Sequence, residues 1–188
     1  MTPIRLVYEL REILRDILKD YRMEESDLTD GQRELRAPNV WIQYLPEKLY
    51  EGEVDPADYP FAQILFGGGS GITDNKMPLD ITILVGGYDD GQIIDGGVRD
   101  NQGWLIPTEM CWRIITRLVR DPLQGPYKLN TEQISWEIPI HEQPKPQWFG
   151  MVHTSWETHI PPAHYDLRNM DSHADLPCAQ ALIEEINT

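Results

Sequence analysis

Apolar side chains recur at helical spacing in two separate segments of the chain. The first is residues 3–21, with Thr2 available as an N-cap and Pro3 at the first helical position, where its missing N–H costs nothing. The second is residues 107–120, which must end before Pro122 because the residue before a proline resists helical angles. The apolar sides consist of Leu6, Leu10, Ile13, Leu14, Ile17 and Tyr21 in the first helix and Cys111, Ile114, Ile115, Leu118 and Val119 in the second.

Five further segments carry the β-branched and aromatic residues typical of strands. They are residues 39–45, 60–66, 79–88, 127–140 and 148–160. In the last of these, side chains alternate between two faces: Val152, Thr154, Trp156 and Thr158 on one, and His153, Ser155, Glu157 and His159 on the other. The order α-β-β-β-α-β-β predicts an α+β fold, a mostly antiparallel sheet of about five strands with two main helices packed on it.

One domain is predicted over residues 1–160, since no repeat or second core interrupts the pattern. Residues 161–188 form an acidic C-terminal extension with five acids and one base, a net of 1 − 5 = −4. This extension is expected to attach loosely or to reach a neighbouring subunit, with a short helix near residues 178–186.

The glycine-rich run at residues 67–71 resembles a phosphate-binding loop only superficially. Such a loop needs a helix after it and a lysine followed by serine or threonine. Here Lys76 is followed by Met77 and a further strand, so the run is interpreted as a flexible hairpin loop. Gly68 and Gly69 are candidate contact residues in this loop.

The chain is strongly acidic, with 16 basic and 31 acidic residues and a net charge of −15. Such a surface repels nucleic acid, because affinity for DNA depends largely on lysine and arginine neutralising phosphates. The alternative is that the charge serves solubility alone. No apolar run approaches the roughly 20 residues needed to cross a bilayer, so no membrane association is expected. No signal-peptide pattern opens the chain, and Cys111 and Cys178 are expected to stay free thiols in a cytoplasm.

Residues with metal-binding or catalytic chemistry do not form a recognised pattern. The acids Asp89, Asp90, Asp95 and Asp100 lack the spacing of an EF-hand, so a solvated loop is the preferred interpretation. His153 and His159 would lie about 20 Å apart on one strand, too far to share a metal ion. No serine sits in a G-x-S-x-G elbow. The sequence therefore predicts no catalytic residue, metal or cofactor.

Tryptophan is concentrated in the C-terminal half of the chain, at positions 104, 112, 136, 148 and 156. Most of these side chains are expected in the core. Trp148, Phe149 and Gly150 lie beside prolines at the start of a strand, which suggests a packed corner or a contact with another subunit. Trp104 is a further candidate for this role.

The aromatic and proline pattern resembles a family of small proteins encoded in the tail modules of bacteriophages and prophages, the tail-terminator-like or tail-completion proteins. The resemblance covers residues 3–160. Its most specific piece is Trp136-Glu137-Ile138-Pro139, followed by a proline-rich turn and Trp148-Phe149-Gly150. The glycine-rich loop and the extension after Pro161 depart from the family pattern.

This resemblance implies a structural virion assembly protein and not an enzyme. Its subunits would form a ring, typically a hexamer, that caps the tail tube, ends tail polymerisation and offers the head-side joining surface. The implied partners are other copies of the chain, the tail tube protein and the head–tail connector protein, with DNA passing through without tight binding. The implied location is the head-proximal end of the virion tail, after assembly in the bacterial host cytoplasm.

Three alternatives stay open at this point. A head–tail connector or neck protein also forms rings, and a metal-dependent enzyme would use the Asp-rich loop at residues 89–100. A generic oligomeric binding module is the third. Contacts that close a ring are expected in the loops at 46–59, 67–78 and 89–103 and in the extension, with Gly68, Gly69, Asp90 and Asp95 as candidate loop contacts.

Overall fold

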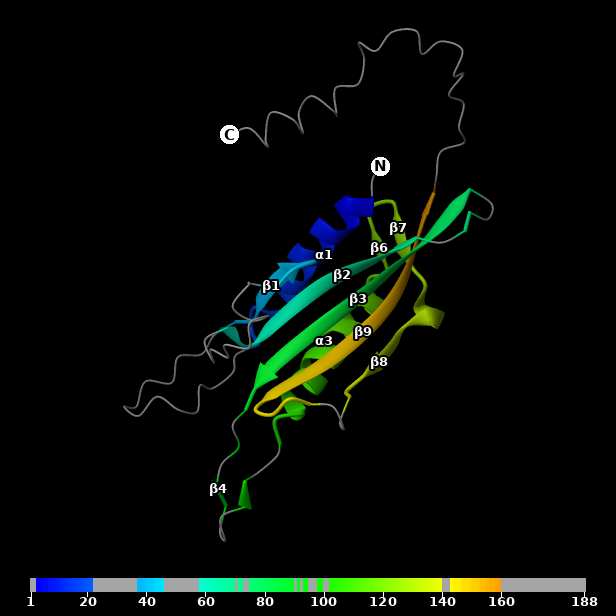
Figure 1. The fold of residues 1–188 in the computed structure, drawn as a ribbon. Coiled ribbons are helices and arrows are strands. Elements are labelled where there is room, and N and C mark those ends of the chain that lie inside the picture. The colour runs from blue at the N-terminus through cyan, green and yellow to red at the C-terminus, as the bar shows by residue number, and fades with distance from the viewer. Residues whose placement is uncertain are drawn as a thin grey trace, which may run out of the picture.

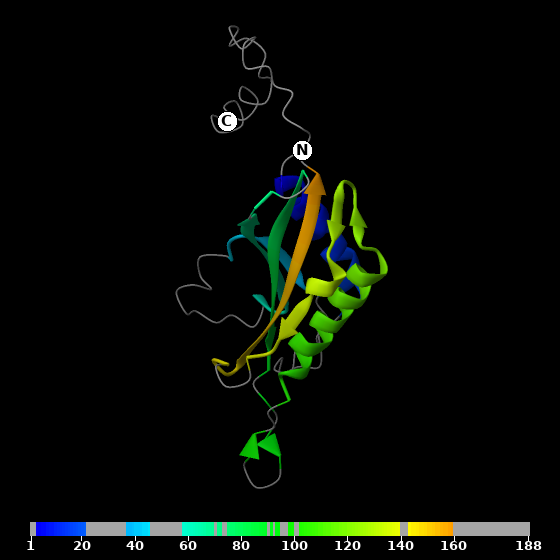
Figure 2. The same cartoon turned by 90° about the vertical axis from the view of Figure 1, so that its right-hand side faces the viewer.

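Two helices lie on one face of a curled sheet in the computed structural model (Figure 1), and a second view shows both on the same side (Figure 2). The structure describes residues 3–21, 37–45, 58–69, 71–72, 75–89, 91, 93–94, 98–99, 102–139 and 143–159. The helices are α1 (Pro3–Leu18) and α3 (Leu105–Arg120). This arrangement is an α+β fold, as the order of predicted elements indicated.

Within the described residues the main sheet has seven strands and includes one parallel pair, so it is mostly antiparallel as predicted but differs in detail from the predicted five strands and element order. Its strands are β1 (Asn39–Ile42), β2 (Phe61–Gly69), β3 (Lys76–Tyr88), β6 (Leu123–Gln124), β7 (Tyr127–Leu129), β8 (Ser135–Glu137) and β9 (Gln147–His159). The order is β1-β2-β3-β9-β7-β6, and β8 pairs with β9 beside this path. β1 runs parallel to β2, whereas the other pairs are antiparallel. Strands β4 (Ile93–Ile94) and β5 (Val98–Arg99) form a separate two-stranded sheet.

The centre of the sheet is the antiparallel pair β3–β9. Every residue of both strands has a partner, from Lys76 opposite His159 to Tyr88 opposite Gln147. This ladder pairs the main-chain groups that the two strands turn toward each other, and β2 on one side with β7 and β8 on the other pair groups on their outer sides. α3 packs across this pair, whereas α1 packs beside it on β1 and β2 and against α3.

Alternate residues of the central strands face the helices and form the core. The core side chains are Leu6, Leu10, Leu14 and Leu18 of α1, Met110, Cys111, Ile114 and Leu118 of α3, and Ile64, Ile81, Ile83, Val152 and Trp156 of the sheet. The expected two-face alternation of the last strand is thus confirmed, since Val152, Thr154, Trp156 and Thr158 are all buried. Polar groups there have partners: the Trp156 indole donates to the Thr154 hydroxyl (3.0 Å), which donates to the Ile81 carbonyl (2.9 Å).

The segment predicted as one strand over residues 127–140 is broken into two. β7 pairs with one end of β9 and β8 pairs nearer the middle, with the 3-10 turn Thr131–Gln133 between them. The Asn130 side chain accepts a hydrogen bond from the Glu132 amide and so caps this turn. This local cap competes with strand pairing and ends β7.

The glycine-rich run also differs from its prediction as a hairpin loop. Gly67, Gly68 and Gly69 belong to β2, with an irregular register between Phe66 and Gly68. Gly68 has a φ of 118°, which L-residues with a side chain rarely adopt. The run therefore continues the strand through a bulge.

We predict that Cys111 stays unreactive toward thiol reagents in the folded protein. Its side chain is fully buried against the sheet, and burial raises the pKa of the thiol to about 12, so almost no thiolate exists near pH 8. In a Cys178→Ser variant, Cys111 is the single thiol, and Ellman's reagent should modify it only after denaturant is added. Fast reaction under native conditions would contradict this packing.

Candidate interaction surface

Trp148 lies in a packed corner at one end of the sheet. Its side chain is 4% exposed, and its indole nitrogen donates to the Asp89 carbonyl at 3.3 Å. Gly103, just before α3, passes so close that an added Cβ would lie 2.2 Å from that nitrogen. The Lys145 ammonium lies 5.7 Å from the centre of the ring. The indole therefore joins the start of α3 to β9 and to the end of β3.

Phe149, the next residue, points to the opposite face of the sheet. There its ring lies 6.2 Å from that of Phe61, and Tyr59 lies 5.3 Å from Phe61 and 6.0 Å from Tyr88. The Gln143 side chain binds both main-chain groups of Phe149, at 2.7 and 2.8 Å. This aromatic cluster closes the helix-free face of the sheet near the corner.

Gly150 brings α3 and β8 close to β9. A Cβ at this position would lie 2.6 Å from Ile138, 3.0 Å from the Cys111 sulfur and 3.2 Å from Pro107. Trp148 and Gly150 are thus buried inside the subunit, and Phe149 is partly buried. The candidate at this corner that a partner can reach is Trp104, which is 43% exposed at the start of α3.

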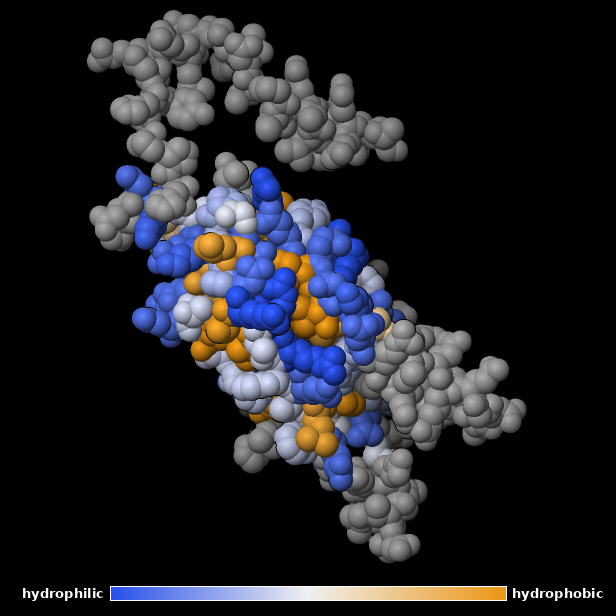
Figure 3. Space-filling model, turned by 180° about the vertical axis from the view of Figure 1, so that it is seen from behind, coloured by the Kyte–Doolittle hydropathy of each residue, from blue (hydrophilic) through white to orange (hydrophobic). Residues whose placement is uncertain are grey.

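A second row of apolar side chains follows the outer side of α3, away from the core. Leu105, Trp112 and Val119 are spaced seven residues apart, so they share one side of the helix, and their exposed fractions are 46%, 62% and 45%. Leu123 on β6 is 60% exposed just beyond the helix. These four residues are called the α3 stripe below. Figure 3 shows the helix-bearing side, where apolar patches are broken up by polar ones.

The α3 stripe corrects two expectations from the sequence. Val119 was expected on the buried side of its helix, and most tryptophans were expected in the core. Instead, Trp104, Trp112 and Trp136 are all exposed large hydrophobic side chains. The sequence does show apolar residues at 105, 112 and 119, spaced seven apart. The pattern was missed because the apolar residues on the buried side of the same helix give a stronger signal.

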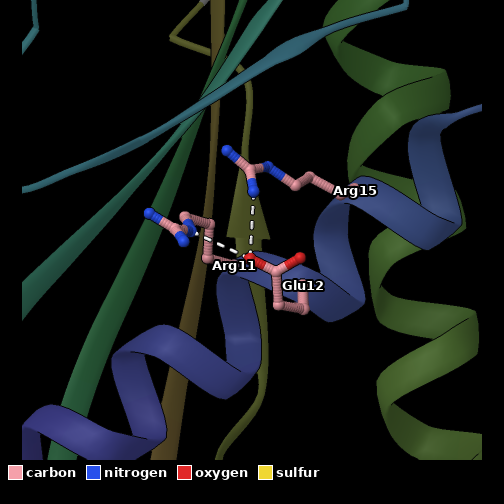
Figure 4. A network of polar contacts seen from close by, with 3 residues as sticks. All are labelled: Arg11, Glu12 and Arg15. Carbon is pink, nitrogen blue, oxygen red and sulfur yellow. Dashed lines mark hydrogen bonds and ion pairs between the residues drawn. The ribbon is translucent and has the colours of Figure 1, made fainter.

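α3 carries more bases than acids in this otherwise acidic chain, whereas α1 carries three of each. α3 carries Arg113, Arg117 and Arg120 against one acid, Glu109. On α1, Glu12 accepts hydrogen bonds from Arg11 and Arg15 at 3.1 and 3.0 Å (Figure 4). Exposed ion pairs of this kind stabilise a fold by only about 0–1 kcal/mol each. The main effect of these charged residues is therefore on the electrostatic potential at the surface of the helices.

A shallow polar depression of about 300 Å³ lies on the helix-free face. In it the Thr82 hydroxyl is 3.1 Å from His153 Nδ1, and His153 Nε2 is 3.7 Å from a Glu137 oxygen. The other polar lining residues are Asp80, Gln133, Thr154 and Ser155. Within the described part of the chain, no group of three or more His, Cys, Asp or Glu residues could hold a metal ion.

The candidate loop contacts are only partly within the described residues. Gly68 and Gly69 lie at the end of β2. Asp90 and Asp95 fall outside the described residues, as do Asp100 and the extension at 161–188. Of the four acids in the hypothesised metal site at 89–100, Asp89 alone is described, and its carboxylate accepts a hydrogen bond from the Gly91 amide at 2.9 Å.

Comparisons with known proteins add no relative: no protein-family model matches the chain, and no curated protein matches it. Within the described residues, neither helix is long and apolar enough to span a membrane.

We predict that Gly103→Ala destabilises the fold by about 1–3 kcal/mol, the usual cost of overpacking. The added Cβ would collide with the buried Trp148 ring and with the Asp89 side chain. Gly67→Ala is the matched control, because its Cβ would meet only ordinary contacts, the closest at 3.4 Å. Urea unfolding of both variants measures the difference. Equal midpoints for the two would refute the proposed tight packing at Gly103.

Proposed function

We propose that this protein is a structural assembly subunit of a tailed bacteriophage, of the tail-terminator type. A ring of subunits, typically six, caps the tail tube, ends its polymerisation and forms the joining surface for the head–tail connector protein. The observation that carries the proposal is the α3 stripe, because large apolar side chains aligned on an exposed surface mark sites of protein association. The aromatic motif ending at Trp148-Phe149-Gly150 supports it through the family resemblance.

The shape of the subunit is compatible with ring assembly. β2 and β3 run beyond the helices at one end of the sheet, and β4–β5 projects at the other end (Figure 1). A heterologous interface, in which one surface of a subunit binds a different surface of the next, closes into a ring when the rotation allows it. The α3 stripe is one such surface. The projecting parts of β2 and β3, or of β4–β5, would offer strand edges as the second surface.

The charge of the chain also supports this role. With a net charge of −15, the surface has little affinity for phosphates, so DNA would pass through a ring without being held. Tight, salt-sensitive binding of duplex DNA by the purified protein would contradict this part of the proposal.

The test is binding to purified tail tubes. In negative-stain images the wild-type protein should form a ring on one end of each tube, and light scattering should give the number of subunits. A head–tail connector, the second candidate, would instead bind the portal-proximal complex and leave free tube ends bare. Absence of binding to tubes would overturn the terminator role.

We predict that Trp112→Ala weakens binding to tube ends about tenfold or more, the usual effect of removing a central interface tryptophan. Tyr44→Ala is the control, because Tyr44 is a similarly exposed aromatic residue just after β1, at the opposite edge of the sheet. Sedimentation of protein with tubes gives both affinities. Equal weakening by both substitutions, or by neither, would argue against the α3 stripe as the interface.

A further inference from the structure

The C-terminal extension has the sequence pattern of a segment that binds an apolar surface. Ala179, Leu182, Ile183 and Ile186 recur at three- and four-residue intervals, the spacing of one helix face. Pro177 precedes them at a position suited to the first turn of a helix. Residues 161–188 carry five acids and one base. The extension therefore combines an apolar side with a net charge of 1 − 5 = −4.

The α3 stripe is complementary to this pattern in both respects. Trp112 is the most exposed residue of α3 among its large apolar side chains, so covering it removes the most apolar surface from water. On α3, Arg113 is paired with Glu109 and Arg117 with Asp121 just after the helix, which leaves Arg120 as its arginine without an ion pair among the described residues. Arg120 is exposed beside Val119, at the end of α3 nearest Leu123. An acidic apolar segment fits this surface better than it fits the rest of the acidic chain.

The end of β9, from which the extension starts, lies near this surface. Near the end of β9, Thr158 pairs with Tyr127 of β7, and β7 forms a hairpin with β6, which follows α3 directly. β9 therefore ends one hairpin away from the last turn of α3. The segment 160–175 that precedes Leu176 spans up to about 50 Å when extended, and a helix the length of α3 spans about 24 Å.

The same geometry favours docking within one chain over docking between copies. A covalent link of this length holds the extension near the stripe at an effective concentration of roughly millimolar, well above ordinary protein concentrations. Two free copies, each with a net charge of −15, also repel one another.

We propose that residues 176–186 dock on the α3 stripe of their own chain and cover Trp112 in the free subunit. This inference concerns the isolated chain and does not depend on the proposed role in tail assembly. Where that role holds, the docked segment keeps the stripe covered until a partner displaces it.

The chain supplies its own labelling site for a test. Cys178 lies in the extension and Cys111 is buried, so a nitroxide maleimide should label Cys178 alone. A nitroxide broadens the NMR signals of nearby protons. In the labelled full-length protein, the Trp112 indole signal and the Val119 and Arg120 amide signals should be broadened. Unchanged signals at all three positions would overturn the proposal.

Two controls separate docking within a chain from other causes. Mixing isotope-labelled chains with spin-labelled unlabelled chains should leave the three signals sharp, and equal broadening in the mixture would overturn docking within one chain. Ile183→Asp should remove the broadening of the three signals, and because residue 183 lies in the extension, it should leave the stability of the folded domain unchanged. Tyr8→Ala, on the exposed side of α1, should leave the broadening unchanged. Broadening that survives Ile183→Asp would likewise contradict apolar docking.

Discussion

The pairing of β3 with β9 is the constraint on which the rest of the structure depends. It joins residues far apart in sequence, such as Ile81 and Thr154, which are 73 positions apart. Because α3 lies in the chain between these two strands, closing the pair also brings α3 back onto the sheet. One face of the pair then accepts α3, while α1 packs beside α3 on β1 and β2. The two ends of the pair lie at the Trp148 corner and at the start of the C-terminal extension. Without this ladder α3 would have no sheet surface on which to bury its apolar side chains.

The local elements of this fold were predictable because their causes are local. Helical spacing located α1 and α3, and alternation assigned Val152 and Trp156 to the buried face of β9. The parallel pairing of β1 with β2 was not predictable, since partner choice depends on contacts remote in sequence. The break at Asn130 and the bulge at Gly68 were missed for a different reason. At position 130 an asparagine side chain caps a turn, and at position 68 the lack of a side chain permits a positive φ. Each of these local effects outweighs the strand propensity of the surrounding residues.

At the candidate site, too, features that depend on neighbouring residues could be predicted from the sequence, and features that depend on residues remote in the sequence could not. The sequence singled out Trp148, Phe149 and Gly150 but left open whether they form a packed corner or an outer contact. Their burial depends on Asp89 and Gly103, which reach the corner only after the sheet has formed. Most of the tryptophans in the C-terminal half were expected in the core, and nothing singled out Trp112 as exposed, because apolar residues on a helix normally share one buried side. A helix with a second, outer stripe breaks that rule, and such exceptions tend to have a functional cause.

The buried corner and the exposed stripe are physically linked through α3. Trp148 packs against Gly103, just before the helix starts, and Gly150 admits Pro107 and Cys111 in its first turns. These contacts fix the position and rotation of the helix, and therefore the direction in which Trp112 points. In the proposed assembly role, the motif that carries the family resemblance would therefore act without touching a partner. It acts by holding a rigid helix, and a rigid surface loses less entropy on binding than a mobile one.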